Sequence, residues 1–374
     1  MAFLPNLPLL LSSFFLLLLL HSPSNAADHP PKATCMFEAI YQLGDSISDT
    51  GNLIRENPAT PFSRLPYGES FFNNPTGRCS NGLLIIDQFA IVAGLPLINP
   101  YLDKDAPMTH GVNFAVAGST ALPSEVLAQK KISSRVTNSS LSKQLDWMST
   151  HFNITCLFKE NDCTKKLKNA LFFVGEIGGN DYNYALFQGK TIEEVRNMVP
   201  EVVQIIKEAV QRVINYGAFQ VIVPGNFPIG CLPIYLAGFQ TDDATAYDEL
   251  HCLKDLNNLA IYHNTHLNDA IKSLRKENPN VNIVYGDYYN ALLWVLREAS
   301  SLGFDETSLH KPCCGMDGDY EFNLMQMCGA PGVPVCGNPG ERISWDGIHL
   351  TQNAYRLMTY WLILNILPRL YCIP

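Results

Sequence analysis

The sequence predicts an α/β protein with a central parallel sheet that helices cover on both faces. Short, continuously apolar segments of strand length alternate along the chain with longer segments of helical period. Continuously apolar strands are typical of a parallel sheet buried on both faces. Of the 374 residues, 47% are hydrophobic and only 16% are charged. This composition supplies a sizeable core and excludes wholesale disorder.

Individual elements follow from the apolar pattern. The predicted strands are residues 37–43, 170–175, 220–224 and 281–286. The predicted helices are residues 83–93, 191–216, 253–277, 288–299 and a closing core helix, 357–368. We place Asp87 and Gln88 on the outer face of the first helix. Pro200 predicts a kink in the second helix or its division into two.

Residues 300–345 differ from the rest of the chain, with seven Gly, four Pro and four Cys. This composition predicts an irregular loop that disulfides hold over the domain. No repeat or low-complexity linker divides the chain after residue 26, so we expect one domain, residues 27–374.

The N-terminus predicts a secreted protein. Residues 1–26 carry no charged side chain, and the leucine-rich run Leu9–Leu20 leads to a polar segment that ends at Ala26. Ser24 and Ala26 have the spacing that a signal peptidase recognises, so we predict a signal peptide over 1–26. An uncleaved anchor is the alternative, but the run is shorter than the roughly 20 residues of a membrane span.

Other features agree with secretion. Asn138-Ser139-Ser140 and Asn153-Ile154-Thr155 are N-glycosylation acceptors. Eleven cysteines indicate disulfides, and their odd number leaves at least one thiol unpaired within the chain. Spacing suggests Cys156–Cys163 and Cys231–Cys252 as pairs without fixing them. No Cys-x-x-Cys or His-x-x-x-His pattern occurs, so we expect no metal.

Charge and the C-terminus limit the partners. The net charge of −9 disfavours nucleic acid, which requires concentrated Lys and Arg. The apolar C-terminal stretch is too short to span a bilayer, so we expect no stable membrane anchor. We expect a monomer that acts on a small molecule.

The segment Gly44-Asp45-Ser46 follows the first predicted strand. A serine at this place lies at the carboxyl edge of the sheet, where α/β proteins bind their ligands. We expect a helix to follow and to aim its N-terminal N–H groups at this point, which favours negative charge there. Ser46 is therefore a candidate nucleophile, although an ordinary Gly-Asp-Ser turn would fit the same residues.

His349 is the candidate base. Asp346 precedes it by three residues, and a turn at Gly347 would let the carboxylate reach the imidazole Nδ1–H. That contact would fix the tautomer and leave Nε2 free to take the serine proton. A structural histidine after an Asx turn is the alternative.

Two glycine-containing segments are candidates for an oxyanion hole. Residues 111–119 end an apolar run in small residues that include Gly118, and residues 175–181 offer the Asn180 amide. Each segment alone would also fit a plain turn.

Together these segments resemble, in order, the four blocks of the GDSL esterase/lipase family, the SGNH hydrolases. The blocks are Gly44-Asp45-Ser46, Gly118, Gly178-Gly179-Asn180-Asp181 and Asp346-Gly347-Ile348-His349. The chain is similar to the plant branch, with Tyr67-Gly68 and residues 75–82 as further marks, and most similar to its acetylajmaline-esterase-like and sinapine-esterase-like members. The resemblance implies a flavodoxin-like three-layer α/β/α sandwich, a secreted or vacuolar hydrolase, and no cofactor.

The resemblance also implies roles. Ser46 attacks an ester carbonyl, His349 transfers the proton, and Asp346 orients His349. The N–H groups of Ser46 and Gly118, with the Asn180 side chain, hold the oxyanion. Asp45 and Asp181 support their loops.

Three other functions remain open at this point. An acyltransferase would use the same residues with an alcohol in place of water. A lipase is also compatible, with residues 232–239 as an apolar flap. A non-catalytic binding protein would be favoured by loss of Ser46, Asp346 or His349, and all three are present.

Overall fold

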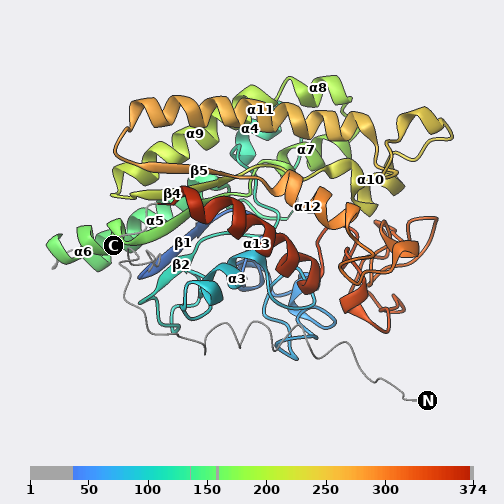
Figure 1. Cartoon of the computed structure of the whole chain (residues 1–374), viewed down its shortest axis with the longest axis horizontal. Helices are drawn as coiled ribbons and strands as arrows, with labels where there is room; N and C mark the ends of the chain where they lie inside the picture. Colours follow the sequence, from blue (N-terminus) through green and yellow to red (C-terminus); the bar gives the residue numbers. More distant parts are fainter. Residues whose placement is uncertain (1–36, 135, 157–159, 371–374) are drawn as a thin grey trace, which may run out of the picture. The chain divides into compact units, whose positions relative to one another are not determined.

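A parallel sheet forms the centre of the molecule. The computed structural model describes residues 37–134, 136–156 and 160–370. In this part of the chain the sheet has five strands, all paired in parallel. Their order is β2 (Gly111–Asn113), β1 (Ala39–Leu43), β3 (Ala170–Val174), β4 (Gln220–Pro224) and β5 (Asn282–Gly286) (Figure 1). The predicted α/β class is confirmed. The sequence missed β2 because three residues are too few to show a pattern.

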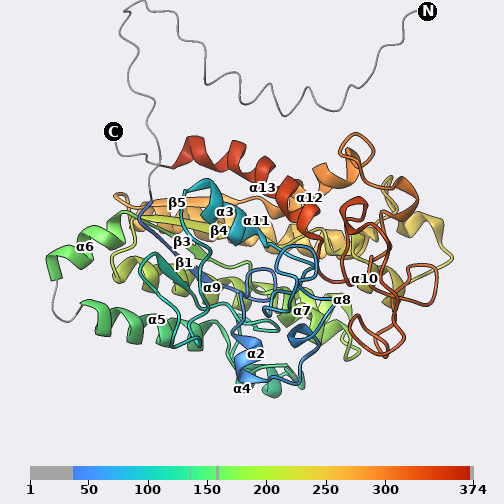
Figure 2. The same ribbon diagram turned by 90° about the horizontal axis from the view of Figure 1, so that it is seen from below.

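Helices cover both faces of the sheet, which gives three layers (Figures 1 and 2). One face carries α5 (Leu141–Cys156), α9 (Val199–Asn215) and α11 (Lys254–Glu277). The other carries α3 (Ile85–Val92) and α13 (Gln352–Ile366), against which α12 (Tyr288–Arg297) packs. The shorter helices are α2 (Leu53–Glu56), α4 (Ser124–Gln129), α6 (Glu160–Lys168), α7 (Gly179–Leu186), α8 (Ile192–Arg196) and α10 (Pro233–Gly238).

The helix predicted over 191–216 is two helices, α8 and α9, so Pro200 marks a break and not a kink. Pro200 lies in the first turn of α9, where a missing N–H costs no intrahelical hydrogen bond. Thr191 begins α8 by accepting the N–H of Glu194 at 3.2 Å.

The placement of Asp87 on the outer face of α3 was wrong. Its side chain is fully buried, and both carboxylate oxygens bind the Arg78 guanidinium at 2.7 and 2.8 Å. The carboxylate also accepts the N–H of Leu84 at 2.9 Å. A buried charge is tolerated when it is paired and hydrogen-bonded in this way, and local sequence did not reveal Arg78 as the partner.

Loops that follow the strands meet at the carboxyl edge of the sheet. The N–H of Gly175, after β3, donates to Leu43 O at 2.9 Å, and the N–H of Val116, after β2, donates to Gly44 O at 3.2 Å. A Cβ at position 44 would lie 3.0 Å from the carbonyl oxygen of Glu176, so only glycine allows this close approach. These backbone hydrogen bonds and the close approach at Gly44 place the residues after β1, β2 and β3 beside one another.

The cysteine-rich segment is irregular, as predicted. Between α12 and α13 the described chain forms short 3-10 turns, and the disulfides Cys313–Cys336 and Cys314–Cys328 hold it. The two suggested pairs, Cys156–Cys163 and Cys231–Cys252, are also formed. Among the cysteines that the structure describes, Cys79 is free and buried.

Three predictions concern the chain termini and membrane spans. The predicted signal peptide lies outside the described residues. Within the residues that are described, no helix combines the length and the apolar character needed to cross a membrane. The closing helix 357–368 corresponds to α13, which begins earlier, at Gln352.

A buried histidine makes the fold sensitive to acid. His263 on α11 is fully buried, and its Nδ1 lies 2.7 Å from the hydroxyl of Tyr182 on α7. Burial lowers the pKa of His263 to about 3. An unfolded histidine titrates near 6.5, so the unfolded state takes up a proton below that pH while the folded state does not. Stability is therefore lost as the pH falls from about 6.5 toward 3.

We expect His263→Gln to remove this loss. Between pH 6.5 and 4.5 the unfolding free energy of the parent should fall relative to the variant by about 2 kcal/mol, with a slope that approaches roughly 1.4 kcal/mol per pH unit only below about pH 5.5. Denaturant unfolding at each pH measures the difference in unfolding free energy between the parent and the variant. The contributions of all other titrating groups are the same in both proteins and cancel in this difference. His110→Gln, at an exposed histidine, is the control and should follow the parent. A constant difference between parent and His263→Gln would contradict the assignment.

Candidate active site

Ser46 lies in the turn directly after β1, at the carboxyl edge of the sheet, and is 8% exposed. The Asp45 side chain shapes this turn by accepting the N–H of Ile47 at 3.0 Å. Gln144, on α5, holds the turn from the other side, since its amide accepts the Gly44 N–H at 2.9 Å and donates to Gly44 O at 2.8 Å. The structure thus fixes the predicted nucleophile at the predicted edge.

Asp49 joins the Ser46 loop to the loop after β2. Its buried carboxylate accepts backbone N–H groups at 2.6 to 3.0 Å, from Gly51, Asn52, Leu53 and Ala117. The Ala117 bond fixes the backbone next to Gly118. Sequence analysis missed this role and that of Gln144, because a residue's long-range partners cannot be read from spacing.

Asp346 and His349 form the predicted pair. Asp346 Oδ2 lies 2.7 Å from His349 Nδ1, while Oδ1 accepts the N–H groups of Ile348 at 3.0 Å and of His349 at 2.7 Å. The turn at Gly347 thus folds the carboxylate back onto both the backbone and the ring. His349 Nε2 is buried and has no hydrogen-bond partner among the described residues.

Tyr67 is a supporting residue that sequence analysis did not assign. Its hydroxyl donates to Asp346 Oδ2 at 2.8 Å, and its ring is fully buried against Trp345 and Phe62. Phe62 in turn packs edge-on against the His349 ring at 5.7 Å. The Tyr67-Gly68 dipeptide was noted in the sequence, but nothing there connected it with Asp346.

These contacts keep Asp346 ionised. Burial by itself would raise the pKa of Asp346, but the charge and hydrogen bonds of His349 and the N–H of Ile348 outweigh it, and the pKa lies below its ordinary value. Burial and the Asp346 charge raise the pKa of Tyr67, so its hydroxyl stays a donor. The pair can therefore stabilise an imidazolium at neutral pH.

Ser46 and His349 line the same pocket, which has a cavity volume of about 330 Å³. Its walls are mostly apolar, with Phe62, Val136, Phe187, Ile234, Leu324 and Met327 among them. Ile234 belongs to α10, so the segment predicted as a flap is instead a buried helix that forms part of the wall.

The predicted oxyanion donors also reach this pocket. Gly118 and Asn180 line it beside Ser46. In the described structure no hydrogen bond uses the backbone N–H of Ser46 or of Gly118. Gly118 has φ +82°, and a Cβ there would lie 2.6 Å from Val136, so glycine is required.

Asn180 is already engaged. Its Nδ2 donates to Ser119 O at 2.9 Å and to Asp45 Oδ2 at 3.2 Å. Burial raises the pKa of Asp45 to about 7. Asp181 accepts the N–H groups of Ala121 and Leu122 at 2.8 and 2.9 Å, which agrees with a supporting role.

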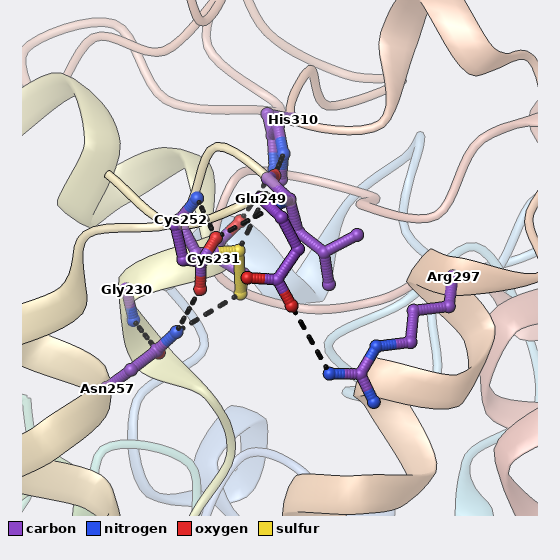
Figure 3. The surroundings of a disulfide bond; sticks show 9 residues. Gly230, Cys231, Glu249, Cys252, Asn257, Arg297 and His310 are labelled. Atoms are coloured by element: carbon purple, nitrogen blue, oxygen red, sulfur yellow. Dashed lines mark hydrogen bonds and ion pairs between the residues drawn. A yellow bond between two sulfur atoms is a disulfide. The ribbon is translucent and has the colours of Figure 1, made fainter. Parts of the chain in front are cut away.

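A disulfide anchors the α10 side of the site. Cys231–Cys252 joins the 3-10 turn Ile229–Cys231, which precedes α10, to the segment just before α11, and Asn257 Oδ1 accepts the N–H of Gly230 at 2.9 Å (Figure 3). His310, from the cysteine-rich segment, lies with its ring nitrogens 3.1 Å from Cys231 O and 2.7 Å from Leu250 O (Figure 3). These contacts hold the wall that carries Ile234.

Comparisons with known proteins agree with this arrangement. The family model described as GDSL-like lipase/acylhydrolase matches residues 40–362. Acetylajmalan esterase 1 of Rauvolfia serpentina is 47% identical over 90% of this chain and 89% of its own length. A GDSL esterase/lipase of Arabidopsis thaliana is 46% identical, covering 90% of this chain and 92% of its own.

We expect Tyr67→Phe to lower kcat for 4-nitrophenyl acetate about tenfold with little change in KM. The variant removes one hydrogen bond to a charged group, worth about 1.5 kcal/mol, and leaves the ring packing intact. Tyr355→Phe is the matched control, because the Tyr355 hydroxyl is a buried partner of the Leu350 N–H and does not contact Asp346. Equal kcat values for Tyr67→Phe and the parent would refute the positioning role.

Removing the Cys231–Cys252 disulfide should both destabilise the protein and loosen the pocket. The double variant Cys231→Ala/Cys252→Ala should lose about 3 kcal/mol of unfolding free energy. KM should rise because the α10 wall is no longer clipped. Cys156→Ala/Cys163→Ala, far from the pocket, is the control and should lose stability without a change in KM. An unchanged KM in both double variants would show that the wall does not depend on the disulfide.

Proposed function

Because the chain belongs to the family of GDSL-like lipases and acylhydrolases and is accordingly a carboxylic ester hydrolase, we propose that it cleaves small plant acyl esters through a covalent acyl-enzyme on Ser46. One observation carries the proposal: His349 is oriented by Asp346 and presents an unpartnered Nε2 in the pocket that Ser46 also lines. A serine nucleophile requires such a base.

The proposed reaction has two halves. Ser46 Oγ attacks the ester carbonyl while His349 Nε2 takes its proton, and the imidazolium then gives that proton to the leaving alcohol oxygen. Water attacks the acyl-enzyme with His349 again as base, which releases the acid and restores Ser46. Asp346 holds the tautomer with hydrogen on Nδ1 and stabilises the imidazolium. The reaction needs a neutral His349, so activity should fall on the acid side.

The oxyanion would be held by the N–H groups of Ser46 and Gly118 and by Asn180. The N–H groups of Ser46 and Gly118 make no other hydrogen bond among the described residues, which supports their assignment to the oxyanion hole. Asn180 would give up its longer contact, the 3.2 Å bond to Asp45, to reach the oxyanion. One such donor is typically worth about 3 to 4 kcal/mol of transition-state stabilisation.

The relatives named acetylajmalan esterases suggest the substrate class. As their names state, they are esterases of acetylajmalan. For this chain we extend the substrate class from acetyl esters to short acyl esters in general. The apolar walls of the large pocket favour an apolar alcohol as the other half of the ester. The same walls would suit a lipase substrate or an acceptor alcohol, which keeps lipase and acyltransferase as the alternatives.

The proposal includes secretion of the mature chain. The side chains of Asn138 and Asn153 are exposed, as glycan attachment requires. Asn153 lies near the end of α5. Together with the signal peptide predicted from residues 1–26, these positions favour a secreted glycoprotein, with the vacuole as the alternative destination.

Replacing Ser46 tests the proposal. Ser46→Ala should lower kcat for 4-nitrophenyl acetate by at least a thousandfold and leave the circular dichroism spectrum unchanged. Asp346→Asn should lower kcat with little effect on KM, because it spoils the tautomer and the developing charge. Activity of Ser46→Ala within tenfold of the parent would show that another residue is the nucleophile. Product analysis with added alcohols separates hydrolysis from acyl transfer.

A further inference from the structure

A second, smaller pocket adjoins the first at Ser46. Its cavity volume is about 50 Å³, against about 330 Å³ for the large pocket. Ser46, Asn180, Asn183 and Ile348 line both pockets, whereas His349 lines only the large one. A substrate with its carbonyl carbon at Ser46 can therefore place one half in each pocket.

The small pocket contains buried polar atoms without partners. Tyr235, Asn226, Asn183 and Glu176 line it, and each carries a buried side-chain atom without a hydrogen-bond partner among the described residues: Oη, Nδ2, Oδ1 and Oε1 in turn. Tyr235 is 1% exposed and Asn226 is 2% exposed. Leaving such a group unsatisfied costs about 1 to 3 kcal/mol, and native structures contain few. Four around one pocket beside the nucleophile point to a ligand that satisfies them.

The chain holds these groups in place. The Asn226 backbone is fixed from both sides by Asn264, which accepts its N–H at 2.7 Å and donates to its carbonyl at 3.0 Å. The Tyr235 ring packs against Phe187 and Phe239 with centroids 5.7 and 6.3 Å away. The polar atoms are therefore preorganised, which reduces the cost of ordering them on binding.

Protonation sets what the pocket can accept. Burial raises the pKa of Glu176 well above its ordinary value, and burial also keeps the Tyr235 hydroxyl protonated. The Tyr235 hydroxyl and the Asn226 amide can then donate, whereas the Asn183 amide oxygen accepts and the Glu176 carboxyl is hydrogen-bonded to Asp45. The neighbouring Asp45 disfavours an anion. The complementary ligand is an uncharged group with an oxygen that accepts hydrogen bonds.

The position of His349 decides which half of the ester enters. As general acid, His349 must reach the leaving alcohol oxygen, so the alcohol extends into the large pocket that His349 lines. We propose that the small pocket is the acyl site and selects a short acyl group that carries an ether, hydroxyl or carbonyl oxygen. This inference rests on the proposed function and names its substrate class.

Two esters of equal size test the inference. 4-Nitrophenyl methoxyacetate and 4-nitrophenyl butyrate share one leaving group and differ by one ether oxygen in place of a methylene. The ratio of their kcat/KM values is measured in the parent and in Tyr235→Phe, so their different intrinsic reactivities cancel. Tyr235→Phe removes a hydroxyl that has no partner, so the fold should be unaffected. The methoxyacetate-to-butyrate ratio should fall about tenfold, through loss of methoxyacetate activity.

Tyr184→Phe is the matched control. The Tyr184 hydroxyl donates to Gly118 O at 2.8 Å and lines only the large pocket, so this variant should change both esters alike and keep the parental ratio. An unchanged ratio in Tyr235→Phe, with both esters hydrolysed, would refute the acyl site and mean that the polar atoms bind water. Absence of hydrolysis of either ester by the parent would refute the proposed function itself, and the acyl site with it.

Discussion

The buried carboxylate of Asp346 is the group on which the site depends. A charge at this depth is stable only because its oxygens accept from the His349 ring, two backbone N–H groups and Tyr67. The turn at Gly347 supplies the His349 ring and the two backbone N–H groups. A distant loop supplies the Tyr67 hydroxyl. The same contacts hold the imidazole, which lines the large pocket, with no hydrogen bond at its Nε2 in the described part of the chain. The hydrogen bonds that stabilise the buried Asp346 charge therefore also orient the His349 ring.

The cysteine-rich segment also holds Asp346 in place. The N–H groups of Cys313 and Cys314 donate to the carbonyls of Ser344 and Trp345 at 2.9 and 2.7 Å, immediately before Asp346. Both cysteines are in disulfides, and they pack with Tyr67 and Trp345 in one buried cluster. An irregular loop has little regular hydrogen bonding of its own, so covalent bonds fix the chain that presents Asp346.

The two pockets differ in the chemistry of their walls. The large one is mainly apolar, and a mobile apolar group could bind there in several orientations. The small one is lined beside Ser46 by buried neutral polar groups, the donors Tyr235 and Asn226 and the acceptor Asn183. Such a wall discriminates between substrates because an unmatched ligand leaves buried polar groups unpaired. Under the proposed acyl site, the small pocket selects the acyl group and the large one accommodates the alcohol.

The sequence by itself determined the α/β class and four of the strands. It also identified Ser46, Asp346 and His349 as candidates, of which the structure brings Ser46 and His349 to one pocket and joins Asp346 to His349. Strand periodicity and a three-residue offset across a glycine turn are local properties, so they can be read along the chain. Tertiary structure alone decided the rest. Tyr67 is 279 residues from Asp346, and Arg78 meets Asp87 inside the core, against the prediction of an exposed Asp87. Gln144 reaches Gly44 across 100 residues. The small pocket likewise joins residues that follow β1, β3 and β4, and such neighbours are set by strand order and parallel pairing, which spacing does not encode.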